Sequence, residues 1–350
     1  MIGTLCARRA GPLRPDAHAI ERRNPHTVQQ YRRHLRIFLQ WCAEHGLELT
    51  DTAALDDLLV EFKNMCDVSK AQFAYTLSAV QMAYPAARGN LQWAASVLRD
   101  MEIQCPIQHH LALPYGLSLV LAIAMALMGH SRLAAGLIIS QQRGLRPSEW
   151  LRLEKGDVTL PEWLAFGNNG AAVLNLGART GTKVKRAQAV LIDARRHPLA
   201  LALIRVLVTT TPPARQLAGP QNLPGYQKVL AAACTSLMLP LFTPHSARAG
   251  FATDGFLANR DFVSLREEGR WQSDKSLHTY LDAVTTCSQA ASTAAHHWGP
   301  TIRWLESNFM LAFVWWPEAQ ALSFPVLPAP FKPLVLQQSS CRYVPHFLEI

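Results

Sequence analysis

Six residues between positions 146 and 280 have side chains suited to chemistry on a phosphodiester. In chain order they are Arg146, Lys183, His245, Arg248, Trp271 and Tyr280. A phosphodiester attacked by an oxygen nucleophile gains negative charge on its non-bridging oxygens. Two arginines suit that charge, because each offers a planar fork of donors and stays protonated. A tyrosine nucleophile needs such electrostatic help, since the ordinary pKa of a phenol is about 10.

Four of the six residues lie in one stretch, from Pro244 to Asp282. Thr243 and Pro244 suit the start of a helix, which would place His245 and Arg248 on one face of its first turn. Ser273 and Asp274 can cap a second helix that carries Tyr280. Taken alone, the stretch favours an ordinary helical hairpin with one exposed tyrosine. Arg146 and Lys183 upstream favour the catalytic interpretation.

The motifs around these residues resemble those of the tyrosine recombinase (phage integrase) family. The matching segments are Gly144-Leu145-Arg146-Pro147-Ser148-Glu149, then Lys183, then His245-Ser246-Ala247-Arg248 with Phe251-Ala252-Thr253, then Trp271 and Tyr280. The intervals from His245 to Trp271 and to Tyr280, 26 and 35 residues, are similar to those of the family. A pattern near the N-terminus resembles the family's core-binding domain, through Thr27, Tyr31, Leu35, Phe38 and Trp41. The resemblance covers residues 22 to 284.

The resemblance implies a role for each side chain. Tyr280 would attack the phosphodiester, form a covalent 3′-phosphotyrosyl link and release a 5′-hydroxyl. Arg146 and Arg248 would clamp the phosphate, with Glu149 orienting Arg146. His245 would assist proton transfer or bind the phosphate. Trp271 replaces the more usual histidine, and its indole N–H can donate a hydrogen bond but cannot transfer a proton.

The general acid for the leaving oxygen would be Lys183, on a hairpin tip, with a pKa lowered by nearby arginine charge. Arg179 and Lys185 lie on the same loop and are alternatives. Lys183 is preferred because its distance along the chain to Val190 is similar to that in the family. The ligand spacing suggests no metal, and the reaction needs no cofactor.

The resemblance therefore implies a site-specific recombinase or integrase from a mobile element, acting as a homotetramer on double-stranded DNA. Two alternatives stay open: a DNA-binding relative that has lost strand exchange, and a type IB topoisomerase-like enzyme. Three features depart from the family pattern. Arg270 stands where glycine often precedes the histidine or tryptophan, the segment between Arg146 and Lys183 is long, and the sequence after residue 298 resembles nothing recognisable.

Composition agrees with a DNA-binding protein. The chain has 350 residues, 34 Lys+Arg against 25 Asp+Glu, and a net charge of +9, which favours an anionic partner. Seven cysteines without metal-ligand spacing suggest reduced thiols in an intracellular protein. The longest apolar run, residues 116–129, is too short to span a bilayer. We expect a soluble protein located with DNA, in the nucleus of a eukaryote or the cytoplasm of a bacterium, and no membrane partner.

The hydrophobic pattern predicts a mainly α fold with a small antiparallel β-sheet, in two domains. We expect a disordered lead-in over 1–21, a helical core-binding domain over 22–105, a linker over 106–114, a catalytic domain over 115–297 and an atypical Trp/Pro-rich tail over 298–350. In the first domain, helices are expected over 24–46, 52–66, 70–84 and 91–101. Arg32, Arg33 and Arg36 cluster on the first helix, either as a solvated face or as contacts to DNA phosphates.

In the second domain, apolar helices are expected over 115–142, with a break near Gly129, and over 198–209 and 226–238. Strands are expected over 158–164, 171–176 and 187–192, with a hairpin tip over 177–185. The segment 210–224 reads as an exposed loop. Residues 285–297 are expected to be helical and to be able to dock on a neighbouring subunit.

Overall fold

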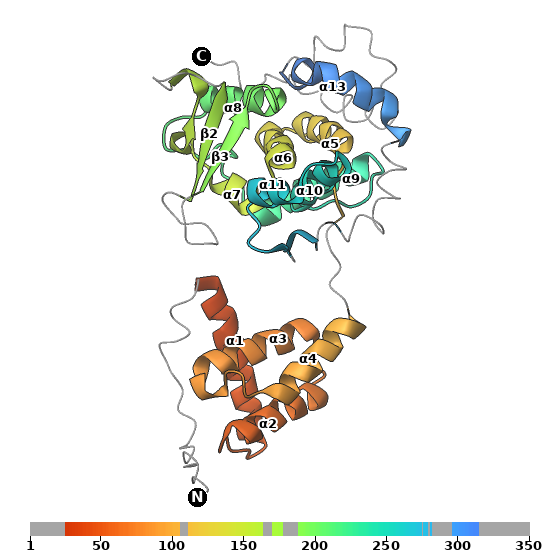
Figure 1. Ribbon diagram of the computed structural model, residues 1–350. Coiled ribbons are helices and arrows are strands. Elements are labelled where there is room, and N and C mark those ends of the chain that lie inside the picture. Colours follow the sequence, from red (N-terminus) through yellow and green to blue (C-terminus); the bar gives the residue numbers. More distant parts are fainter. Residues whose placement is uncertain are drawn as a thin grey trace, which may run out of the picture. The chain divides into compact units, whose positions relative to one another are not determined.

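The computed structural model of the protein describes residues 25–105, 111–163, 170–177, 188–274, 276–278, 281 and 296–314. The chain divides into two compact units, Met1–Gln108 and His109–Ile350 (Figure 1). The expected lead-in, the hairpin tip and residues 285–295 lie outside the described residues. In the part of the chain that is described, helices dominate and one three-stranded antiparallel sheet is present. The predicted fold class is therefore confirmed.

The smaller unit is built from four helices that begin and end at local sequence signals. They are α1 (Pro25–Glu44), α2 (Thr52–Met65), α3 (Lys70–Ala83) and α4 (Gln92–Gln104). Asp51 caps α2, and Ser69 forms a capping box with Gln72 at the start of α3. Gly46 follows α1 with a φ of +64°, the left-handed backbone that favours glycine after a helix. All four helices match the predicted ones within a few residues.

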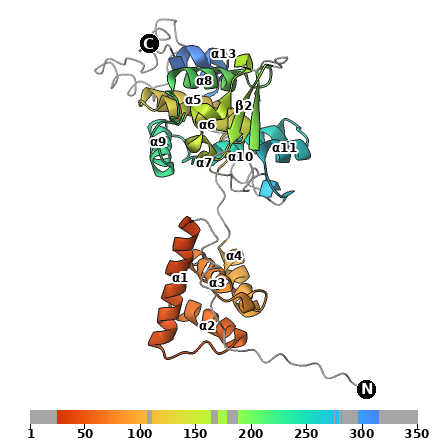
Figure 2. The same ribbon diagram turned by 90° about the vertical axis from the view of Figure 1, so that its left-hand side faces the viewer.

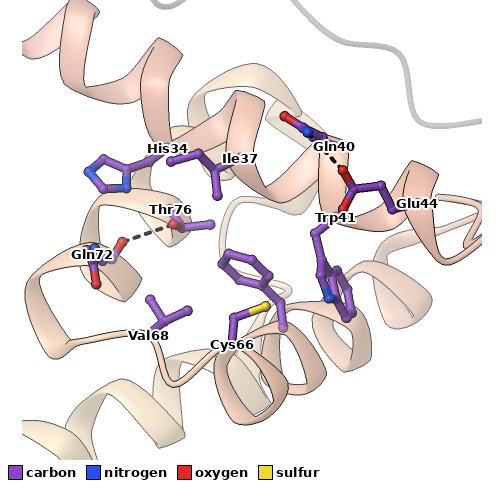
Figure 3. A pocket seen from close by; sticks show the side chains of 10 residues that line it. His34, Ile37, Gln40, Trp41, Glu44, Cys66, Val68, Gln72 and Thr76 are labelled. Carbon is purple, nitrogen blue, oxygen red and sulfur yellow. Dashed lines mark hydrogen bonds between the residues drawn. The ribbon is translucent and has the colours of Figure 1, made fainter.

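Aromatic side chains form the centre of this unit. The Phe62 ring of α2 lies 5.4 Å, centroid to centroid, from the rings of both Phe38 and Trp41 of α1. Toward one edge, α1 separates from α2 and α3 around a pocket of about 350 Å³ (Figure 3). His34 and Ile37 of α1 line it on one side, and Thr76 of α3 on the other.

A buried carboxylate positions the fourth helix of the smaller unit. Asp56 of α2 accepts hydrogen bonds from the backbone N–H groups of Trp93 (2.9 Å) and Ala94 (2.8 Å), in the first turn of α4. These N–H groups have no partner within their own helix, and a negative charge there is also favoured by the helix dipole. Asp56 thus caps a helix that begins more than thirty residues later.

Replacing Asp56 with alanine should therefore destabilise α4. We expect the free energy that protects the α4 amides to fall by about 1–3 kcal/mol, because two buried donors lose their acceptor. Amide hydrogen exchange of residues 92–104, followed by mass spectrometry, measures this change. Asp57→Ala is the control, because Asp57 is its exposed neighbour. Equal exchange in the two variants would contradict the assignment.

The larger unit surrounds one apolar helix. Every residue of α5 (Tyr115–Leu127) from Leu117 onward is buried. Around it pack α6 (Ser131–Arg143), α9 (Leu223–Ser236), α10 (Ser246–Leu257) and α13 (Gly299–Val314). Figure 2 shows the same arrangement from the side. The remaining helices are α7 (Pro147–Arg152), α8 (Pro198–Thr210) and α11 (Phe262–Gly269).

The sheet has the order β1–β2–β3, with β1 at Val158–Thr159, β2 at Ala171–Leu176 and β3 at Gln188–Asp193. Leu174 of β2 lies opposite Val190 of β3, and both face the core. The alternation of buried and half-buried residues along β2 follows the predicted strand. The expectation of a first strand reaching residue 164 is wrong. The strand ends at Thr159 because Pro161, which has no N–H to donate, begins a 3-10 turn.

Two more expectations in the larger unit need correction. The helix expected from Pro244 begins at Ser246, because Ser246 closes a turn onto Thr243: its backbone N–H donates to the Thr243 carbonyl, and its hydroxyl accepts from the Thr243 N–H. The expected loop over 210–224 is not wholly exposed. Leu217 is buried, and its N–H donates to the Leu153 carbonyl at 2.8 Å.

The first part of the expected tail belongs to the core. Helix α13 contacts α5 and α8 (Figure 1), and its side of contact is apolar. The buried residues are Trp298, Leu305, Phe309, Ala312 and Phe313. Phe309 follows Leu305 after four residues, and Ala312 and Phe313 follow Phe309 after three and four, which is the pattern of an amphipathic helix. No helix in the described part of the chain is long and apolar enough to cross a membrane.

Candidate active site

The candidate site is organised around the turn between α6 and α7. Gly144 ends α6 with a φ of +58°, and a β-carbon at this position would lie 2.8 Å from the Phe251 ring. Glycine is therefore required twice, by the left-handed backbone and by the close packing. The turn delivers Arg146 to the start of α7, where Pro147 occupies the first helical position.

Arg248 of α10 is buried beneath this turn, with 2% of its surface exposed. Its guanidinium donates to the Gly144 carbonyl and, at 2.5 Å, to the Gly269 carbonyl. The same guanidinium lies 4.3 Å from the ring centroid of Trp271, as a cation–π contact. A β-carbon on Gly269 would lie 1.7 Å from the Trp271 ring, so a glycine there lets the ring reach Arg248.

Arg146 lies above Arg248 and is more accessible, with 18% of its side chain exposed. Its guanidinium donates to Glu149 Oε1 at 2.6 Å and to the Arg270 carbonyl at 3.2 Å. The Arg146 backbone N–H donates to the other oxygen of Glu149 at 2.8 Å. Burial alone would raise the pKa of the Glu149 carboxyl, but Arg270 and these contacts with Arg146 hold it below its ordinary value. Glu149 is therefore ionised at neutral pH.

Arg270 is the least expected member of the cluster. It follows α11 with φ +58° and ψ 41°, a left-handed conformation that costs a non-glycine residue about 1–2 kcal/mol. Its buried guanidinium donates to Glu149 Oε2 at 2.7 Å and to the Gly144 carbonyl at 3.2 Å. Arg146, Arg248 and Arg270 thus converge on the Gly144 turn.

A second set of charges fixes the end of α11 beside this turn. Glu268 accepts from Arg143 of α6 at 3.1 Å and also pairs with Arg260. Arg143 in turn lies 3.1 Å from the His197 imidazole. Burial, and then the charge of Arg143, lowers the pKa of His197 to about 4. The imidazole is therefore neutral at physiological pH and adds no charge to the cluster.

The structure brings together four of the predicted site residues: Arg146, Glu149, Arg248 and Trp271. His245 is half-buried and directly precedes α10, one turn before Arg248. Lys183 and Tyr280 lie outside the described residues, as do the alternatives Arg179 and Lys185. Leu277 and Leu281, which flank Tyr280 in sequence, pack in one apolar cluster with Trp271 and Phe251.

Sequence reasoning missed Arg270 as a member of the site, and it missed the Glu268 cluster entirely. Arg270 was noticed only as a departure from glycine. The available signal was an arginine at a position where glycine often precedes the histidine or tryptophan. In the described residues, no three His, Cys, Asp or Glu side chains form a group that could hold a metal ion.

The three arginines predicted to contact DNA lie on the smaller unit. Arg32, Arg33 and Arg36 are exposed and line one hollow along α1, together with Val28 and Ile37. This placement concentrates three positive charges within little more than one helical turn.

Comparisons with known proteins identify the fold. No family model matches the sequence, and no curated protein matches it. A solved structure of the integrase of transposon Tn1549, in complex with transposon right-end DNA, aligns with a TM-score of 0.54 at 13% identity, over 75% of this chain and 93% of that one. The chain has the fold of a tyrosine recombinase. Matches to XerA recombinase and to the protelomerase TelA, covalently complexed with substrate DNA, have TM-scores of 0.36 and 0.41 at 15% and 14% identity. They cover 74% and 78% of this chain, and 88% and 95% of theirs.

A half-buried carboxylate anchors α10, the helix that carries Arg248. Asp254 accepts from the backbone N–H of Tyr115 at 3.0 Å and from the Gln141 amide at 2.6 Å. Burial raises the pKa of Asp254 to about 6 despite these two hydrogen bonds. The carboxyl thus connects α10 to the start of α5 and the end of α6. When ionised, it holds a negative charge in a poorly solvated place, which is unfavourable.

Asp254→Asn should therefore stabilise the protein at pH 7. A folded-state pKa above the unfolded value means that the carboxyl contributes most to stability below about pH 4, and that this contribution is lost as the pH rises through about 6. Asparagine can accept both hydrogen bonds without a charge, so we expect a gain of about 1–2 kcal/mol at pH 7 that vanishes near pH 4. Urea unfolding of both proteins at several pH values measures it. A gain that grows as the pH falls would contradict the assignment.

Proposed function

We propose that the protein is a DNA strand transferase that breaks and rejoins DNA through a covalent 3′-phosphotyrosyl intermediate. The observation that carries the proposal is the convergence of Arg146 and Arg248, from motifs a hundred residues apart, on the Gly144 turn of a tyrosine recombinase fold. An ion pair with a purely structural role at this turn would need only one arginine. A dianionic transition state benefits from several.

In the proposed reaction, the Tyr280 oxygen attacks the phosphorus and gives up its proton to His245 or to water, and the bond from phosphorus to the 5′ oxygen breaks. Lys183 gives that oxygen a proton. The phosphotyrosyl bond conserves the energy of the phosphodiester, so a second 5′-hydroxyl can attack it and reseal the strand without ATP. Arg146, the more exposed guanidinium, would meet the phosphate first, and Arg248 would support it from beneath.

We propose a second role for Trp271. Its ring supports the Arg248 guanidinium at 4.3 Å, so it would fix an arginine as well as offer an indole N–H to the phosphate. His245 would share the proton transfers or bind the phosphate. We also propose that the protein acts as a homotetramer on two duplexes and comes from a mobile element. A neighbour in fold is described as a transposon integrase, which supports the proposed origin.

Tyr280→Phe should abolish formation of a covalent protein–DNA adduct while leaving DNA affinity within about twofold, because only the nucleophilic oxygen is removed. The substrate is a library of nicked suicide duplexes of many sequences, because the amino-acid sequence does not specify the target site. The covalent adduct is detected after denaturation. Tyr226→Phe is the control, because it removes the hydroxyl group of a buried tyrosine in the same unit.

The result also separates the alternatives. Binding without an adduct in the unsubstituted protein would identify a DNA-binding relative that has lost strand exchange. Relaxation of arbitrary supercoiled plasmid would favour a topoisomerase. An adduct that persists in Tyr280→Phe would overturn the assigned nucleophile.

We further propose that Arg32, Arg33 and Arg36 contact DNA phosphates. Each phosphate contact contributes about 0.9 to the slope of log affinity against log salt concentration. Changing all three to glutamine should reduce that slope by about 2–3, with an equal effect on unrelated sequences. Affinity measured at several salt concentrations tests this, with Arg99→Gln on α4 as the matched control. An unchanged slope would assign the three arginines to the solvated face.

A further inference from the structure

Arg270 touches every other part of the arginine cluster. Its carbonyl accepts from Arg146, its guanidinium binds Glu149, and it shares the Gly144 carbonyl with Arg248. These contacts come from a residue whose left-handed backbone is disfavoured for arginine. Strain of this kind persists where surrounding contacts over-determine it, and it gathers at functional sites.

The Glu149 carboxylate creates an electrostatic conflict that Arg270 resolves. Glu149 fixes Arg146 through two hydrogen bonds, to the guanidinium and to the backbone N–H. The same contact places a negative charge 2.6 Å from the group proposed to attract the phosphate, in a poorly solvated place. Glu149 alone would thus orient Arg146 and cancel much of its attraction for an anion.

Arg270 supplies the missing charge at the far oxygen of the same carboxylate, 2.7 Å away. With it, two guanidiniums pair with one carboxylate. The cluster of Arg146, Arg248, Arg270 and Glu149 then keeps two net positive charges instead of one. The side chain of Arg270 is only 6% exposed, less than that of Arg146 at 18%, so Arg270 is placed to act on Glu149 and not on the substrate.

We propose that Arg270 is a positioning residue of the phosphoryl-transfer site, which neutralises Glu149 so that Glu149 holds Arg146 without weakening its grip on the phosphate. This inference rests on the proposed function, because it assigns the anion at Arg146 to a phosphoryl group. It differs from a merely structural role in one respect. If Arg270 acts by neutralising Glu149, then removing the Glu149 charge must relieve the loss of Arg270.

The test measures, by calorimetry, how the full-length protein binds orthovanadate, a tetrahedral oxyanion that resembles phosphate. Arg270→Gly leaves a backbone that prefers the left-handed conformation and removes only the side chain. We expect it to weaken orthovanadate binding about tenfold. The double variant Glu149→Gln with Arg270→Gly should recover to within about threefold of the unsubstituted protein.

Two further variants keep the test decisive. Arg152→Gln removes an exposed arginine of α7 and should change the affinity less than about twofold. If Arg270→Gly does not fold, as judged by urea unfolding, Arg270→Gln with and without Glu149→Gln replaces it, because glutamine retains a hydrogen bond but no charge.

The proposal is overturned if Arg270→Gly binds orthovanadate as well as the unsubstituted protein does, or if the double variant binds no better than Arg270→Gly. It is also overturned if the unsubstituted protein binds none, or binds it equally well with Arg146→Ala. Because orthovanadate binding requires no DNA cleavage, these outcomes are independent of whether the Tyr280 adduct forms. Failure of the strand-transfer proposal and failure of the Arg270 proposal are therefore distinguishable.

Discussion

The larger unit depends on one backbone carbonyl, that of Gly144. It accepts from the guanidiniums of Arg248, in the first turn of α10, and Arg270, directly after α11; both lie more than a hundred residues later in the chain. Buried positive charges repel one another and lose hydration, so they are stable only where each finds acceptors. The Gly144, Gly269 and Arg270 carbonyls and the Glu149 and Glu268 carboxylates provide these acceptors. A single left-handed glycine thus joins α6 and α7 to the helices that complete the site.

This arrangement gives the motif arginines two tasks. Arg248 is almost fully buried, holds two carbonyls and lies on the Trp271 ring, so it contributes to the packing of α10 as much as to any chemistry. Arg146 is the accessible one, and its orientation is fixed from both sides by Glu149 and the Arg270 carbonyl. A fixed donor needs no reorganisation when charge develops on a bound phosphate, which is the physical basis of electrostatic catalysis.

Features of the fold that are encoded locally could be predicted from the sequence. The caps at Asp51 and Ser69 and the alternation along β2 place their elements within a few residues, because each signal acts over a single turn or strand. The errors have tertiary causes. The start of α10 depends on how Ser246 closes a turn onto Thr243, and the cap of α4 is supplied by Asp56 of another helix. For α13 the apolar spacing was present in the sequence, but tryptophan and proline nearby obscured it.

The site shows the same division. Motif spacing predicted Arg146, Glu149, Arg248 and Trp271 as site residues, and the structure brings these four side chains together. In the sequence, Arg270 was visible only as an arginine where glycine is usual, and the structure shows why glycine is usual there: the backbone is left-handed. The backbone preference of arginine and the tertiary contacts of Arg270 oppose each other there. The left-handed backbone costs about 1–2 kcal/mol. The buried ion pair with Glu149 and the hydrogen bond to the Gly144 carbonyl outweigh this cost. A residue whose backbone conformation is unfavourable for its type, beside a charged motif, therefore indicates a tertiary contact that the motif alone does not predict.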